Sequence, residues 1–126
     1  MSLRSPLGRA RGLGSAKSGL HHWIAQRLTA IALVPLSLWF IVTLVCLIGS
    51  DHATAVERLQ SPLTATLLIL FIAALFHHAQ LGVQVVIEDY VHGHWQKLTS
   101  LVVVKFIAVF AALASIIAVL KVSLGL

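Results

Sequence analysis

The imidazole of His78 falls in the middle of a long apolar run. A histidine at bilayer depth is costly and persists only where the protein interior gives it a partner, so it marks a functional site. If the run is helical, one face carries four residues within about 60° of arc: His78, Gly82, Val85 and Asp89. The rise from His78 to Asp89 is roughly 16 Å, about half of the hydrocarbon thickness. This face would connect a site in the membrane core with one at the water interface.

His78 is a candidate metal ligand, although buried histidines are more often only hydrogen-bonded. Its neighbour His77 points about 100° away on a helix, so the two cannot both bind one haem iron. His78 is the better candidate because Gly82, one turn later, leaves room for a planar macrocycle. A bis-histidine haem needs a second imidazole, and no other histidine is expected at midplane depth. The second ligand would therefore come from another chain.

A tyrosine and a carboxylate, Tyr90 and Asp89, end the same helix. One interpretation is an interfacial anchor alone, with a solvated carboxylate. Alternatively, the tyrosine hydroxyl could donate to a quinone carbonyl while the carboxylate relays a proton or orients the tyrosine. Near the start of the first apolar run, Arg27 either snorkels to anchor the span or pairs with haem propionates, and His21 could join it.

Three apolar stretches of the 126-residue chain must position these side chains. Hydrophobic residues make up 59% of the chain and charged residues 10%, whereas roughly a quarter of a soluble domain is charged. The stretches cover about residues 28–48, 63–87 and 101–122, and each is long enough for a helix that crosses ~30 Å of hydrocarbon. The alternation that a transmembrane barrel requires is absent. The sequence predicts an all-α integral membrane protein with three transmembrane helices.

The distribution of basic residues predicts the orientation. Five of them precede or open the first span: Arg4, Arg9, Arg11, Lys17 and Arg27. Because basic residues stay on the cytoplasmic side, we expect the N-terminus inside, the C-terminus outside and the Asp89 end at the inner face.

Residues 1–19 are predicted to form a basic, flexible N-terminal arm, followed by a three-helix anchor domain over residues 20–126. The arm accounts for most of the net charge of +5. It could set the topology, or it could contact anionic lipid or an acidic partner surface. It lacks interleaved aromatic residues, so nucleic acid is not an expected partner.

Two segments resemble a known family, the small hydrophobic membrane-anchor (D) subunit of succinate dehydrogenase, respiratory complex II. The segment from His78 to Tyr90 reads HAQLGVQVVIEDY and is similar to the family pattern His-x3-Gly-x6-Asp-Tyr. The segment from His21 to Ala30 reads HHWIAQRLTA and is similar to the pattern His-x5-Arg-x-Thr-Ala. The number and order of the spans also match. The chain looks most like the alphaproteobacterial and mitochondrial-related members.

This resemblance implies a subunit of succinate:ubiquinone oxidoreductase that does not act on succinate by itself. The expected partners are a flavoprotein carrying FAD, an iron–sulfur subunit with the clusters, and a second, cytochrome b-type anchor in the lipid bilayer. His78 would be one axial ligand of a haem b shared with that second anchor. Arg27 and His21 would contact its propionates, and Tyr90 with Asp89 would bind ubiquinone. The expected location is the bacterial inner membrane, with the mitochondrial inner membrane as the less favoured option.

Two other functions remain open. An anchor of fumarate reductase or of another cytochrome b-linked dehydrogenase would keep haem and quinone and change the soluble partner. A non-redox scaffold or small transporter would leave His78 merely hydrogen-bonded. A transporter is expected to show repeats or broken helices at the midplane, which the sequence lacks.

Overall fold

The computed structural model describes residues 6–10, 12 and 19–126. The described residues form five helices: α1 (Pro6–Ala10), α2 (Gly19–Leu47), α3 (His52–Gln60), α4 (Pro62–Tyr90) and α5 (His94–Ser123). Helices α2, α4 and α5 are long and apolar enough to cross a membrane. The prediction of an all-helical chain with three candidate spans is therefore confirmed for this part of the chain. Most of the predicted N-terminal arm, residues 1–5, 11 and 13–18, lies outside the described residues.

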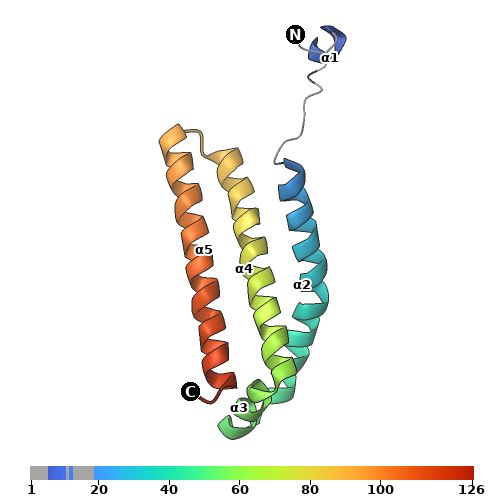
Figure 1. Ribbon diagram of the computed structural model, residues 1–126, viewed down its shortest axis with the longest axis vertical. Coiled ribbons are helices and arrows are strands. Elements are labelled where there is room, and N and C mark those ends of the chain that lie inside the picture. The colour runs from blue at the N-terminus through green and yellow to red at the C-terminus, as the bar shows by residue number, and fades with distance from the viewer. Residues whose placement is uncertain (1–5, 11, 13–18) are drawn as a thin grey trace.

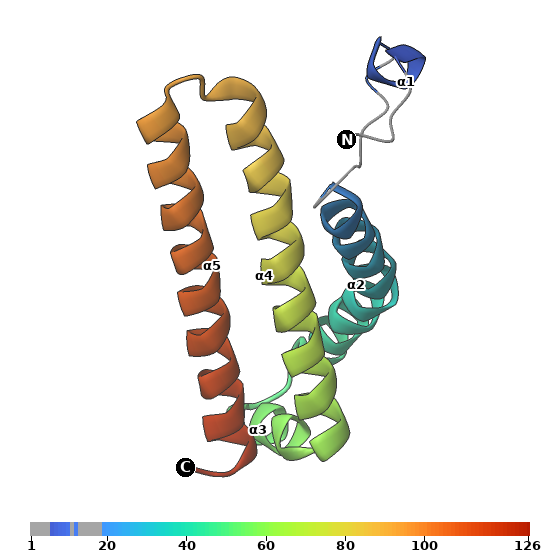
Figure 2. The same ribbon diagram turned by 45° about the horizontal axis from the view of Figure 1, so that its top comes forward.

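Helix α4 is central, with α2 packed on one side and α5 on the other (Figures 1 and 2). The three long helices alternate in direction. The start of α2, the end of α4 and the start of α5 therefore lie at one end of the bundle, and α3 lies at the other (Figure 1). This arrangement brings the predicted interfacial residues of the first and second spans to the same end.

The helix ends follow from local chemistry. Pro62 occupies the first turn of α4, where its missing N–H costs nothing. Ser61 precedes it at the N-cap position, but its side chain makes no capping bond. Tyr90 is the last residue of α4, and the Lys97 ammonium donates to the Glu88 carbonyl oxygen at 2.7 Å, which satisfies one of the open carbonyls at that helix end.

The long helices extend beyond the predicted apolar limits, and α3 was not predicted. Helix α2 begins at Gly19, ahead of the apolar stretch that starts near residue 28, because its polar first turns continue the helix without an apolar signal. It passes through Pro35 without a break. Helix α3 lies in the connection between the first two spans, and the Asp51 carboxylate caps it by accepting from the Thr54 N–H at 3.0 Å.

Little of this chain is buried within itself. Only four apolar side chains are classed as buried among the described residues, all of them on α4: Ala65, Leu68, Leu81 and Ile87. Large apolar side chains are exposed along all three long helices, as at Ile31, Leu70 and Phe110. Such surfaces require lipid or partner helices around them, so the chain is a membrane protein whose α2 and α5 faces remain open for contacts.

Candidate functional site

The His78 imidazole is half-buried between α4 and α2. Its Nδ1 lies 2.9 Å from the hydroxyl oxygen of Thr29, which is a normal hydrogen-bond length. Its Nε2 lies 3.5 Å from the amide nitrogen of Gln26, at the outer limit of such an interaction. The ring is therefore firmly held through one nitrogen, and the other nitrogen has only a weak contact.

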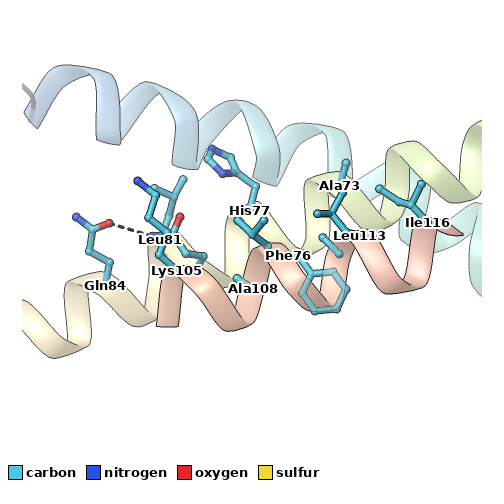
Figure 3. A pocket seen from close by; sticks show the side chains of 12 residues that line it. Ala73, Phe76, His77, Leu81, Gln84, Lys105, Ala108, Leu113 and Ile116 are labelled. Carbon is cyan, nitrogen blue, oxygen red and sulfur yellow. Dashed lines mark hydrogen bonds between the residues drawn. The ribbon is translucent and has the colours of Figure 1, made fainter. Parts of the chain in front are cut away.

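His77 lies on a different face of α4, as its spacing from His78 predicts. It lines a groove of about 420 Å³ between α4 and α5, together with apolar side chains and the polar Gln80, Gln84 and Lys105 (Figure 3). The Gln80 amide donates to Gln84 Oε1 at 3.1 Å, the dashed line in the figure. The two adjacent histidines therefore lie on different faces of α4, and only His78 faces α2.

Gly82 lies one turn after His78, next to the Gln26 side chain. A Cβ built on Gly82 would lie 3.9 Å from Gln26 Nε2, which is an ordinary van der Waals contact. It would approach no other described atom beyond the neighbouring backbone of α4 within 4 Å. The packing of this chain alone therefore does not require glycine at this position. The Gln26 amide nitrogen lies close to both the His78 Nε2 and the Gly82 backbone, and its buried Oε1 has no hydrogen-bond partner among the described residues. A buried amide oxygen without a donor is costly, so this atom is a candidate for contact with a group from outside the chain.

Arg27 and His21 are both exposed on α2, and the structure does not bring them together. They are six residues apart, which places them about 120° from each other around the helix. The Arg27 guanidinium instead lies over the Trp23 ring, 5.7 Å from its centre. The neighbouring His22 is half-buried, and its Nε2 has no hydrogen-bond partner among the described residues.

Tyr90 and Asp89 are exposed at the end of α4, with 77% of the Tyr90 surface accessible. They lie at the same end of the bundle as the start of α2 (Figure 1). Neither side chain is enclosed by this chain. A ligand bound there would need further walls from other subunits.

Sequence reasoning did not select Thr29, His22 or Gln26 as site residues. The signal that could have found them is helical spacing: residues 22, 26 and 29 follow the i, i+4, i+7 pattern of one face. That face lies against α4 at His78, as the contacts of Thr29 and Gln26 show. To select this face of α2 from the sequence, one would need to know which side of α2 packs against the second span.

Comparisons with known proteins identify the family to which this chain belongs. The family model of the succinate dehydrogenase/fumarate reductase transmembrane subunit matches residues 1–114. The chain belongs to this family. Its relatives include the succinate dehydrogenase hydrophobic membrane anchor subunit of Rickettsia bellii, 38% identical over 92% of this chain and 93% of the relative.

Two further relatives extend this comparison. The succinate dehydrogenase membrane anchor subunit of Reclinomonas americana is 33% identical over 74% of this chain and 80% of its own length. The hydrophobic membrane anchor subunit of Paracoccus denitrificans is 32% identical over 74% of this chain and 72% of its own length. The family predicted from the two sequence segments is confirmed. A transmembrane subunit of this family works as part of an enzyme complex and is not catalytic alone.

Proposed function

We propose that this chain is the membrane anchor of a succinate:ubiquinone oxidoreductase and supplies one axial ligand, His78, to a haem b shared with a second anchor subunit. The observation that carries the proposal is the arrangement around the imidazole. Nδ1 is occupied by Thr29, whereas Nε2 has only a long contact with a side-chain amide. A metal-ligating histidine commonly has this pattern, with one nitrogen bonded to the protein and the other available.

The residues around His78 fit a haem group. Gly82 adds no side chain beside the ligand, and the Gln26 Oε1 and His22 Nε2 are buried polar atoms without partners among the described residues. The adjacent His77 diverges from His78 by about 100° and lines the groove between α4 and α5, so it would not bind the same iron. The second axial ligand would therefore come from the other anchor. When bound, haem b supplies one-electron transfer, and this chain would orient it.

We assign the polar end of the bundle to the propionates and the quinone. Arg27 would pair with a propionate, since a guanidinium offers two parallel donors. His21 is the predicted second contact, and His22 is the alternative because its Nε2 is buried without a partner. Tyr90 would donate to a ubiquinone carbonyl, with Asp89 beside it to relay or orient the proton.

The proposed orientation places the N-terminus, Arg27 and Tyr90 at the cytoplasmic face of a bacterial inner membrane and the C-terminus outside. In this orientation the exposed end of α4 meets the iron–sulfur subunit, to which the flavoprotein is attached. Residues 20–126 would form the anchor domain, and the basic residues of positions 1–19 would lie on the same inner side.

The proposal is tested by purifying the complex in mild detergent through a tag on this chain. We expect a flavoprotein, an iron–sulfur subunit, a second anchor and a b-type haem to copurify with succinate:quinone activity. Faster fumarate reduction by a quinol than succinate oxidation would favour the fumarate reductase alternative. Purification of this chain without redox subunits would contradict the proposal and favour a scaffold.

A further inference from the structure

The hydroxyl of Thr29 is shared between the backbone of α2 and the His78 ring. Its oxygen lies 2.8 Å from the Ala25 carbonyl oxygen and 3.1 Å from that of Gln26, so the hydroxyl is placed to donate its proton within its own helix. The same oxygen lies 2.9 Å from His78 Nδ1. A threonine hydroxyl has one proton and two lone pairs. With its proton on the backbone, it can only accept from the ring.

The hydrogen-bond capacity of Thr29 favours one tautomer of His78. With the hydroxyl proton on a backbone carbonyl, Nδ1 carries the ring proton and donates it to Thr29, which leaves the lone pair on Nε2. The Gln26 amide nitrogen, 3.5 Å from Nε2, is compatible with an unprotonated Nε2. This tautomer is the one that can bind a metal through Nε2.

We infer that Thr29 is a positioning residue for the haem ligand: it holds His78 as the Nδ1–H tautomer, with the lone pair on Nε2. This inference rests on the proposed role of His78 as a haem ligand. Donation of Nδ1–H to an acceptor also makes the imidazole a stronger base toward a metal. Thr29 thereby sets both the orientation of the ligand and its donor strength.

Threonine hydroxyls often bond the preceding turn of their own helix without any further role, and α2 contains such a case. The Thr43 hydroxyl donates to the Trp39 carbonyl oxygen at 2.9 Å, in the same i to i−4 geometry that Thr29 has with Ala25. No contact of Thr43 with a histidine is recorded among the described residues. Thr43 is therefore the matched control for the purely structural effect of the hydroxyl.

The experiment compares Thr29→Val, Thr29→Ser and Thr43→Val in the complete, tagged complex. The measurements are haem per complex after graded detergent washing and the midpoint potential of the haem. For Thr29→Val we expect 10- to 100-fold weaker haem retention, the usual cost of losing an outer partner of a metal ligand. We also expect a higher potential, because a weaker donor stabilises the ferric form less. A tenfold preferential loss of ferric affinity corresponds to 59 mV for a one-electron couple.

Thr29→Ser restores the acceptor and should return both values to those of the wild type, and Thr43→Val should leave both unchanged. Thr29→Ala provides a second removal of the hydroxyl if the valine variant does not assemble. Equal retention and potential in both hydroxyl-free variants and the wild type would overturn the role of Thr29 while leaving His78 as a ligand. Absence of a b-type haem from the intact wild-type complex would overturn the ligand assignment itself, and this inference with it.

Discussion

Substitutions of Gly82 test whether the space beside His78 is needed for packing within the chain or is left open for a bound group. In a helix interior, alanine is favoured over glycine by about 0.8–1.0 kcal/mol. A Cβ at position 82 would make only an ordinary 3.9 Å contact with the Gln26 amide, so no steric cost offsets that gain. We therefore expect Gly82→Ala to raise the stability of the chain in detergent by about 1 kcal/mol.

A larger side chain at the same position should have the opposite effect on haem. The Gln26 amide nitrogen lies 3.5 Å from His78 Nε2 and is also the nearest described neighbour of position 82. A leucine there would need the space next to the proposed iron-binding nitrogen, so Gly82→Leu should lose most of the haem from the complex. The control is Ala79→Leu, which introduces the same side chain on another face of α4, in a second hollow between α4 and α5 of about 220 Å³.

Thermal unfolding in detergent and haem content per complex measure the two effects. A lower unfolding midpoint for Gly82→Ala would show that the chain's own packing needs the glycine. Full haem content in Gly82→Leu would refute the idea that this space receives the macrocycle. Equal losses in Gly82→Leu and Ala79→Leu would indicate a general defect of the α4 surface.

Two further predictions concern the ends of the bundle. Tyr90→Phe should reduce ubiquinone reduction about tenfold, the cost of about one hydrogen bond, and leave electron delivery to a soluble artificial acceptor intact; equal losses in both assays would indicate an assembly defect. At the other end, hydrogen bonds from the Thr54 side chain and backbone lower the pKa of Asp51 below its ordinary 3.8. This cap is therefore present above pH 3.8 and is lost as the pH falls through the lowered value. The protection of amides in the first turn of α3, taken relative to their intrinsic exchange rates at the same pH, should fall on acidification and in Asp51→Ala at neutral pH. Unchanged protection in that variant would contradict the cap.

Much of the fold follows from the sequence because membrane spans are determined by length and apolarity. The three apolar runs became α2, α4 and α5, and the second helix ends at Tyr90 as its motif predicted. The short helix α3 escaped notice because its nine residues carry no long apolar run. Its capping aspartate, Asp51, was the available signal.

The candidate site was only partly predictable, and the reason is tertiary. Helical periodicity was enough to separate His78 from His77, because adjacent residues diverge by a fixed angle. The partners of His78 could not be chosen in the same way. Thr29 and Gln26 were visible in the sequence, but their role depends on which face of α2 packs against α4. His21 stays a predicted propionate contact, and the structure adds His22 as an alternative, because its buried Nε2 has no hydrogen-bond partner among the described residues.

The most direct test of the central claim is a dithionite-reduced minus oxidised absorbance spectrum of the purified complex, recorded for the wild type, His78→Leu and His77→Leu. The two histidines are adjacent, and only His78 faces α2, so His77→Leu controls for the loss of an imidazole at this depth. We predict a b-type haem band in the wild type and in His77→Leu, and a lost or shifted band in His78→Leu. An unchanged band in His78→Leu would contradict the assignment of His78 as the axial ligand.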